Sequence, residues 1–441
     1  MANYTKGTLL EEGKTKKIWQ VIGDESLVII ENKPDITAFD DPKFTKQFKS
    51  KATYATETTS RVFELLKQAG IPVAYVEQIS PTEFVSQKCS MIPLEAVARR
   101  YAVGSYLKRN PNLERPKGEP PVRFHKLVTE FFLKTTKGTL RINDNIIVEG
   151  LDPEKGEEDP FIPNPYNTLW DLIHPKKPLW DSTAKLREGI PASNVLRSQE
   201  VERTMNDLES YLRDTFLVLE GTWAVLGHRL IDLKIEFGAT NKGIVVADVI
   251  DNDSWRLRDQ NWKELSKEAF RQGEELSEVE QKYGIVSDLI GKFRIPEQCL
   301  VLWRGSDKDT FPEISQISNL TSIEIEKITE SGHKSPQRCL NILEDLLRKY
   351  PDGGVIVAKI GMSNGLGPIL AARTSWPVIS IPATFKENPE DVWSSLRMPS
   401  NVPLAVISSE GNATSFALKI LAQKNPLLYQ QLQKKIEELD E

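Results

Sequence analysis

The 441-residue chain has few of the residues on which disulfide frameworks and metal clusters depend. Its three cysteines, Cys89, Cys299 and Cys339, lie far apart, so neither a disulfide framework nor a zinc-binding spacing is expected. The four histidines are also dispersed, which argues against a multi-histidine metal site. No apolar run approaches the roughly 20 residues that a membrane-spanning helix needs. These shortages exclude a disulfide-rich secreted protein and a membrane-embedded one.

An excess of positive charge is also absent. The chain has 57 Lys and Arg residues against 63 Asp and Glu, a formal net charge of −6, whereas general nucleic-acid binders are usually basic. The first residues, MANYTKGTLLEEGKTKKIW, lack the apolar core of a signal peptide, so we expect a cytoplasmic protein. At about 150 residues per domain, the length predicts two or three domains. We therefore expect small-molecule partners, with no nucleic acid and no membrane.

The residues up to about 260 favour an α+β domain. Hairpin signals dominate: GTLLEEGKTKKIW and SLVIIE indicate strands around a turn at Gly13, and LIDLKIEFG alternates between apolar and charged residues. The helical period of 51–69 ends at Gly70, a residue suited to a helix C-terminus. Residues 137–200 are rich in Pro, Gly and charge, and we interpret them as an insertion or surface excursion. The predicted domain thus covers 1–260, with an insertion at about 137–200.

The second half has a different pattern. Residues 261–297 form a charged helical stretch that we interpret as a linker. From 298 onward, five short apolar runs alternate with helical segments, one of them at 311–320. Alternation of this kind predicts an α/β three-layer domain with a mainly parallel, flavodoxin-like sheet, over 298–441 with a C-terminal helix.

Three loops of this second domain carry small and polar residues. They span 305–309, 331–336 and 361–368, directly after the first three predicted strands. Ligands of open parallel sheets bind outside the carboxyl ends of the strands. His333, beside Lys334, would lie at the centre of this rim, where an imidazole can move a proton near neutral pH. The backbone conformation of a strand–helix turn can by itself require small residues, but the convergence of three such loops favours a ligand-binding site.

The motifs of these loops resemble a known family. GSDKD, SGHKSP, SNGLGP and the later DVWSSLRMPS are similar to the aminoimidazole ribonucleotide carboxylase domain of purine biosynthesis, over about residues 298–425. The His-Lys pair and SNGLGP resemble the animal-type form, which uses CO2 without ATP or biotin. By this resemblance, His333 handles the proton of the imidazole carbon that is carboxylated, with Lys334 beside it. The resemblance also implies the nucleotide-binding residues Ser306, Asp309, Ser331, Lys334, Ser363, Asn364 and Gly365.

Five positions depart from that family pattern. Lys308, Gly332, Ser335 and Met362 stand where Ser, Ala, Gly and Arg are expected, and Lys359 places a charge inside a strand. We hypothesise that Lys308 supplies the phosphate-binding charge that Met362 lacks, although a lysine does not reproduce the arginine fork.

The first half contains its own candidates for phosphate and metal binding. Glycine in Glu12-Gly13-Lys14-Thr15-Lys16 lets backbone amides approach a triphosphate, although a Lys-rich hairpin tip of this kind is more often solvated surface. Glu236 and Asp248 fall almost opposite each other across the turn at 241–243, with Lys234 on the same face as Glu236. Paired carboxylates beside a lysine suit Mg²⁺-ATP, and the alternative is a charged solvent face.

These residues belong to motifs that resemble a second purine-biosynthesis family, phosphoribosyl-aminoimidazole-succinocarboxamide synthetase. The similarity covers about residues 5–260, through EGKTKKIW, TAFD (37–40), MIPLEAVARRYAVGSYLKRNP, KIEFG and ADVIDNDSWR. It implies a two-part α+β ATP-binding fold, in which ATP activates a carboxylate that the amine of aspartate then attacks. The implied residues are Gly13, Lys14, Lys16 and Glu236 for ATP, Glu236 and Asp248 for Mg²⁺, Asp40, Lys51, Arg99, Ser105 and Arg256 for substrate, and Lys234 for catalysis. Asp159 is the nearest match to an acidic Asp-Pro loop of the family, and Arg258 stands where a Trp is expected.

Two fused halves of this kind imply a bifunctional enzyme acting on aminoimidazole ribonucleotides, CO2 and L-aspartate. The resemblance further implies a homo-octamer built around the carboxylase domains. Two alternatives stay open: a ligase whose second half only assembles the oligomer, and a nucleotide-binding scaffold without catalysis. Intact Lys14, Glu236, Asp248 and Arg256 argue against the scaffold, whereas Lys308 and Met362 leave the ligase-only hypothesis open.

Overall fold

The chain forms two compact units in a computed structural model that describes residues 4–37, 45–47, 50–266, 275–311 and 322–439. The first unit comprises Met1–Phe293 together with Glu437–Glu441, and the second comprises Arg294–Ile436. The units thus divide after residue 293, whereas the sequence suggested a separate linker over 261–297. No helix within the described ranges combines the length and the apolar character that a membrane crossing requires.

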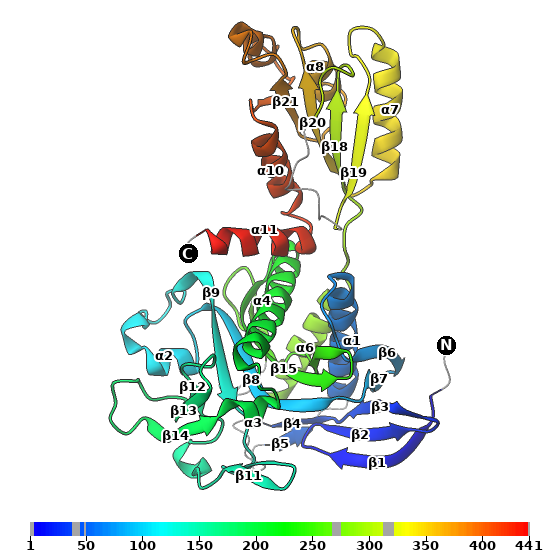
Figure 1. The fold of residues 1–441 in the computed structure, drawn as a ribbon. Helices are drawn as coiled ribbons and strands as arrows, with labels where there is room; N and C mark the ends of the chain where they lie inside the picture. Colours follow the sequence, from blue (N-terminus) through cyan, green and yellow to red (C-terminus); the bar gives the residue numbers. More distant parts are fainter. Residues whose placement is uncertain (1–3, 38–44, 48–49, 267–274, 312–321, 440–441) are drawn as a thin grey trace. The chain divides into compact units, whose positions relative to one another are not determined.

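The first unit begins with a five-stranded antiparallel sheet in the order β1-β2-β3-β7-β6 (Figure 1). The predicted strand pair around Gly13 is present as β1 and β2, and helix α1 (Lys51–Gln68) packs against the sheet and against α6 (Leu276–Ile290). Gly70 follows α1 with a φ of +75°, as expected for a residue that ends a helix. The remaining bounds are β1 (Lys6–Glu12), β2 (Lys16–Val21), β3 (Asp24–Asn32), β4 (Asp35–Thr37), β5 (Thr45–Gln47), β6 (Tyr75–Ser80) and β7 (Glu83–Gln87).

A larger antiparallel sheet carries four of the candidate site residues, Arg99, Lys234, Glu236 and Arg256. Its order is β14-β13-β12-β9-β8-β15-β16, and β17 pairs with β15. The 25-residue helix α4 (Val201–Val225) packs against β8, β9 and β15. The strands are β8 (Ser90–Tyr101), β9 (Arg123–Leu133), β12 (Phe161–Ile162), β13 (Leu169–Ile173), β14 (Lys185–Pro191), β15 (Arg229–Thr240), β16 (Gly243–Ala247) and β17 (Trp255–Arg258). The shorter elements of this unit are α2 (Ser105–Arg109), η2 (Pro111–Leu113), β10 (Leu140–Ile142), β11 (Asn145–Val148), η3 (Pro153–Lys155) and α3 (Ala192–Leu196).

The segment 137–200 differs from the surface excursion that its composition suggested. Strands β12, β13 and β14 extend the large sheet, and Trp170 on β13 is 1% exposed, with its indole N–H bonded to the carbonyl oxygen of Pro165. The Pro and Gly residues mark tight turns between short strands, so a high density of turn residues concealed three sheet strands.

The second unit confirms the predicted α/β three-layer fold. Its five strands are all parallel and follow the order β19-β18-β20-β21-β22. Apolar clusters lie on both faces, one around Trp303 and Leu343 and the other around Leu300 and Leu418. The bounds are β18 (Cys299–Arg304), β19 (Glu324–Thr329), α7 (Pro336–Lys349), β20 (Gly354–Ile360), α8 (Leu366–Ala371), β21 (Val378–Pro382), η4 (Pro389–Val392), α9 (Trp393–Leu396), β22 (Ala405–Val406), α10 (Glu410–Leu421) and α11 (Pro426–Glu438). Apart from Phe311, the helix expected at 311–320 lies outside the described residues.

Candidate functional site

A cavity of about 340 Å³ in the first unit contains four of the predicted site residues. Arg99 on β8, Ser105 at the start of α2, Lys234 on β15 and Arg256 on β17 all line it. The sheet register explains this convergence, since Arg99 lies opposite Asp232 on β15, and Asp232 lies opposite Arg256 on β17. The other lining residues are Glu95, Val97, Phe132, Glu158, Asp159, Pro175, Lys176, Asp232, Asp253, Ser254 and Trp255.

The two carboxylates on the charged face of β15 are buried, whereas the Lys234 side chain between them is 42% exposed. Asp232 and Glu236 are 4% and 8% exposed, so the alternative of a solvated hairpin face is wrong. The alternation of β15 puts Ile235 and Phe237 into the core, and it necessarily gathers Asp232, Lys234 and Glu236 on the other face. Buried charges require partners, so this face is held together by ion pairs.

Two arginines share one carboxylate at the cavity wall. Nη1 of Arg99 and Nη1 of Arg256 both donate to Oδ2 of Asp232, and Nη2 of Arg99 donates to the Ser105 hydroxyl at 3.1 Å. Nε of Arg99 donates to Glu130 at 2.6 Å, and Glu130 also accepts from Arg109. Guanidinium forks held in this way match a phosphate or carboxylate group. Asp232, Glu130 and Arg109 had not been predicted as site residues, although Asp232 stands two residues before Lys234 and Arg109 lies within the motif MIPLEAVARRYAVGSYLKRNP.

A cluster of lysines and carboxylates lies on β15 and on neighbouring strands and loops. Lys234 pairs with Glu95 at 2.6 Å, Lys134 pairs with Glu236 at 2.5 Å, and Lys16 pairs with Asp248. Burial alone raises the pKa of Glu236, but the Lys134 and Lys234 ammonium groups outweigh it and hold this pKa below its usual value. Burial lowers the pKa of Lys16 to about 8, although the nearby Glu236 carboxylate acts in the opposite direction. The cluster therefore presents several ammonium groups to an anion and two carboxylates to a cation.

Among the residues that the structure describes, the remaining predicted site residues of the first unit do not line this cavity. Lys51 is 2% exposed, and its Nζ lies 3.2 Å from Oδ2 of the lining residue Asp253. Gly13 and Lys14 form the β1–β2 turn, closed by a hydrogen bond from Gly13 N to Lys16 O at 2.9 Å. Asp40 lies outside the described residues.

Asp159 is a carboxylate with an unusual environment. Burial, together with the nearby Glu95 charge, raises the pKa of Asp159 to about 7, although the Thr135 N–H donates to its Oδ1 at 2.7 Å. The backbone at Asp159 has a φ of +53°, a conformation that Asp and Asn tolerate better than other side chains. A carboxyl group that titrates near neutral pH inside a cavity is typical of functional positions.

The donor set of Glu236 and Asp248 fits magnesium bound together with a phosphate ligand. Glu236 pairs in register with Ala247, so the following residue, Asp248, lies close to Glu236. Within the described ranges, no group of three or more His, Cys, Asp or Glu side chains is arranged to hold a metal ion. Mg²⁺ in nucleotide sites is commonly held by only one or two carboxylates, with phosphate oxygens and water completing its shell.

The predicted loops of the second unit converge at the carboxyl ends of its strands. The Asp309 carboxylate lies between the ends of β18 and β20: Cβ atoms added to Gly305 and Gly361 would lie 3.6 and 3.3 Å from its oxygens. The Ser306 hydroxyl donates to Oδ2 of Asp309 at 3.0 Å. The Ser331 hydroxyl accepts from the backbone N–H of Lys334 at 3.3 Å. Ser306, Asp309, Ser331 and Lys334 therefore lie on loops that face the same edge of the sheet.

His333 lies against the glycine loop that follows β20. A Cβ atom on Gly365 would lie 2.4 Å from Nε2 of His333, and one on Gly332 would lie 2.6 Å from the Cα of Leu366. The second contact explains why Gly occupies position 332, where the family pattern has Ala, because the backbone of α8 leaves no room for a methyl group. His333, Lys334 and Ser363 are exposed, as ligand-binding groups at a rim must be.

Asn364 and Lys359 are engaged within the fold. The Asn364 amide donates to the hydroxyls of Ser380 and Ser395, both at 2.9 Å, and its carbonyl accepts from Gly367 N–H at 2.9 Å. It thereby anchors the glycine loop. Lys359 donates to Glu410 at 2.7 Å and to the carbonyl oxygen of Thr310 at 2.6 Å, which accounts for a charge inside β20. Lys308 is exposed, and Met362 is 75% exposed.

Comparisons with known proteins match both units. The SAICAR synthetase family matches residues 9–154 and 178–288, and the AIR carboxylase family matches residues 300–441. A Caenorhabditis elegans protein named "Probable multifunctional protein ADE2" is 33% identical over 96% of this chain and 91% of its own length. The human bifunctional phosphoribosylaminoimidazole carboxylase/phosphoribosylaminoimidazole succinocarboxamide synthetase is 31% identical over 98% of this chain and 93% of its own length. The phosphoribosylaminoimidazole-succinocarboxamide synthase of Chloroflexus aurantiacus is 33% identical and covers 65% of this chain and 97% of its own length.

Proposed function

Because the chain belongs to the family of bifunctional phosphoribosylaminoimidazole carboxylase/phosphoribosylaminoimidazole succinocarboxamide synthetases, we propose that it catalyses both reactions. The second unit joins CO2 to aminoimidazole ribonucleotide without ATP. The first unit then uses ATP to join L-aspartate to the carboxylated nucleotide, which gives SAICAR. The observation that carries the proposal is the coexistence, in one chain, of the Arg99–Asp232–Arg256 cavity and the His333 rim.

In the synthetase unit, the guanidinium groups of Arg99 and Arg256, which share the Asp232 carboxylate, bind the anionic nucleotide. Arg99 and Arg256 are oriented by Asp232, and Arg99 is further fixed by Glu130, so little side-chain freedom is lost on binding. Lys234, held by Glu95, contributes positive charge where the activated carboxylate is attacked by the amine of aspartate. Lys51 reaches this pocket through Asp253, and we retain Asp40 as a proposed substrate residue.

ATP and Mg²⁺ are proposed to bind at the lysine and carboxylate cluster. Gly13 and Lys14 in the β1–β2 turn and Lys16 on β2 would face the phosphates, and Glu236 and Asp248 would hold Mg²⁺. Magnesium supplies charge neutralisation for phosphoryl transfer when bound. The chain's own contribution is to keep the Glu236 carboxylate ionised, as its lowered pKa indicates.

In the carboxylase unit, the imidazole of His333 is proposed to move the proton that the carboxylated ring carbon loses. Gly365 lets the ring lie directly against the loop, where a substrate bound by Ser306, Asp309, Ser331 and Ser363 would come within reach. Lys334, adjacent to His333, adds positive charge for the nucleotide phosphate. We also propose a cytoplasmic homo-octamer built around this unit, which sedimentation of the purified protein would test.

One stepwise assay tests the proposal against its rivals. Aminoimidazole ribonucleotide is supplied with bicarbonate, first alone and then with Mg-ATP and aspartate. Carboxylation without ATP followed by SAICAR formation is the expected result. Ligation of pre-made carboxylated nucleotide alone would support a ligase whose second unit only assembles the oligomer. The absence of both reactions would support a nucleotide-binding scaffold.

A further inference from the structure

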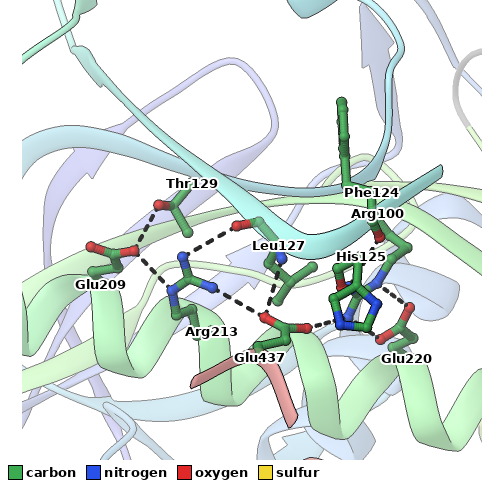
Figure 2. A network of polar contacts seen from close by, with 9 residues as sticks. All are labelled: Arg100, Phe124, His125, Leu127, Thr129, Glu209, Arg213, Glu220 and Glu437. Atoms are coloured by element: carbon green, nitrogen blue, oxygen red, sulfur yellow. Dashed lines mark hydrogen bonds and ion pairs between the residues drawn. The ribbon is translucent and has the colours of Figure 1, made fainter. Parts of the chain in front are cut away.

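Glu437, near the end of α11, is a buried carboxylate that belongs to the first compact unit. Its side chain is 4% exposed, and it lies within the residues that match the carboxylase family rather than the synthetase family. Figure 2 shows it between two arginines, Arg100 on β8 and Arg213 on α4. Burying a carboxylate costs free energy unless it is ion-paired and hydrogen-bonded, so the burial of Glu437 depends on these two arginines.

Arg100 uses all of its donor capacity in this network. Its Nε and Nη2 donate to the two oxygens of Glu220, at 2.8 and 2.9 Å, and its Nη1 donates to the carbonyl oxygens of Phe124 and His125. Nη2 also donates to Oε1 of Glu437 at 2.8 Å. A guanidinium group has five N–H bonds, so Glu437 accepts the last one. Arg100 is fully buried, and without Glu437 this donor would have no protein acceptor in the described network.

The network also closes an irregularity in the strand that pairs with β8. Arg99 pairs with Val128, but Tyr101 pairs with Arg123, so a step of two residues along β8 corresponds to a step of five along β9. Residues 124–127 form the resulting bulge. The Leu127 N–H donates to Oε2 of Glu437 at 3.1 Å, and the Leu127 carbonyl oxygen accepts from Arg213 at 3.2 Å. Buried backbone groups outside regular pairing must find such partners.

The bulge lies beside the nucleotide pocket. Arg99 is the residue before Arg100 on β8, and successive residues of a strand point to opposite faces. Arg99 therefore faces the cavity while Arg100 faces α4 and Glu437, and Ser105 follows a few residues later. Bulges next to active sites commonly set the direction of a functional side chain.

We propose that Glu437 is a positioning residue for the synthetase site: by closing the β9 bulge and completing the hydrogen bonds of Arg100, it fixes where β8 places Arg99 and Ser105. This inference rests on the proposed function for its kinetic test. It also gives a residue that follows the carboxylase-like sheet in the sequence a role in the reaction of the first unit, to which Glu437 belongs.

The test compares Glu437→Gln with Glu438→Gln, an exposed carboxylate on the same helical turn. In the E437Q variant, the amide that replaces the carboxylate would offer an N–H donor where Leu127 N–H and Arg213 require an acceptor. We expect E437Q to raise the KM for the carboxylated nucleotide about tenfold, since small displacements of binding groups have effects of this size or larger. The KM for ATP and the carboxylase reaction should stay at the wild-type values, and E438Q should match wild type throughout.

A second variant covers the possibility that E437Q folds poorly. Glu437→Asp keeps the charge but shortens the reach, so it should give an intermediate KM. The proposal is overturned if both variants lower only the melting temperature or the active fraction while the nucleotide KM stays unchanged, or if E438Q has the same effect. Should the wild-type chain ligate nothing, the proposed function fails first. Titration calorimetry of the carboxylated nucleotide then decides this inference by itself, with a tenfold weaker Kd for E437Q expected and an equal Kd contradicting it.

Discussion

The backbone of Gly104 lies directly against the guanidinium group of Arg256. A Cβ atom on residue 104 would lie 2.8 Å from Nη2 and 3.1 Å from Nη1 of this arginine. Gly104 also has a φ of +59° and a ψ of −134°, which side chains other than glycine rarely adopt. The turn that starts α2 therefore depends on glycine both for its backbone and for the position of a predicted substrate-binding residue.

Gly104→Ala is expected to weaken nucleotide binding by the synthetase unit. The methyl group displaces Arg256 from Asp232, so the KM for the carboxylated nucleotide should rise about tenfold. The strained backbone should also cost about 1–3 kcal/mol of stability. Gly118→Ala is the matched control, because Gly118 has a φ of +96° with open space around it, and its nucleotide KM should not change. An equal rise of KM in both variants would show that backbone strain, and not Arg256, is responsible.

Gly365→Ala is expected to abolish most of the carboxylase activity and to spare the synthetase. A Cβ atom at this position would overlap the imidazole ring of His333. Loss of a positioned proton-transfer group costs about 100-fold or more in rate. His333→Gln should lose as much activity, and the synthetase rate of the same preparation serves as the internal control. Full carboxylase activity in G365A, with activity lost in H333Q, would contradict the proposed position of the ring.

The raised pKa of Asp159 predicts a dependence of stability on pH. In the folded unit this pKa is about 7, against 3.8 for the ordinary carboxyl group, so the folded state holds a proton that the unfolded state has already released. The contribution of Asp159 to stability is complete below pH 3.8 and is lost as the pH rises through 7. Asp159→Asn keeps an acceptor for the Thr135 N–H and tolerates the positive φ.

Calorimetry of the ligand-free protein measures this effect. The free energy of unfolding of D159N minus that of wild type should be larger at pH 8 than at pH 5, by on the order of 1–2 kcal/mol. The difference between their melting temperatures should change in the same direction. A difference between the two proteins that is the same at both pH values would contradict the raised pKa.

Lys308→Ala tests the hypothesis that this lysine replaces the charge missing at Met362. Loss of a phosphate-binding charge should raise the KM for aminoimidazole ribonucleotide about three- to tenfold. Lys424, an exposed lysine of the same unit outside the rim loops, provides the control substitution Lys424→Ala. If K308A and K424A leave the KM equally unchanged, the charge-swap hypothesis is wrong.

The fold of the second unit could be predicted more completely than that of the first. Parallel strands with crossover helices each leave a local signature, and all five predicted strands are present. Strands β12 and β13 are only two and five residues long and lie among Pro- and Gly-rich turns, so the pairing of β12 with β9 and with β13 depends on contacts that no local pattern reveals. The roles of Glu130 and Arg109 could not be predicted for the same reason: Glu130 accepts from both Arg99 and Arg109 only because β9 and α2 fold next to β8.

The site residues were predicted best on the strand in which apolar and charged residues alternate. The pattern of β15 predicted both the apolar core face and the charged face that carries Lys234 and Glu236. It did not predict that Asp232 and Glu236 on this face are buried, because burial depends on the neighbouring strands β8 and β17. Glu437 gave no signal at all, because its partners on β8 and α4 precede it by more than 200 residues.

A labelling experiment shows whether one chain carries out two consecutive reactions. The purified chain is incubated with aminoimidazole ribonucleotide, ¹³C-bicarbonate, Mg-ATP and L-aspartate, and the product is analysed by mass spectrometry and ¹³C NMR. We expect SAICAR that carries the label in its newly formed amide carbonyl. The recovery of unreacted aminoimidazole ribonucleotide, while pre-made carboxylated nucleotide is still ligated to aspartate, would contradict this expectation.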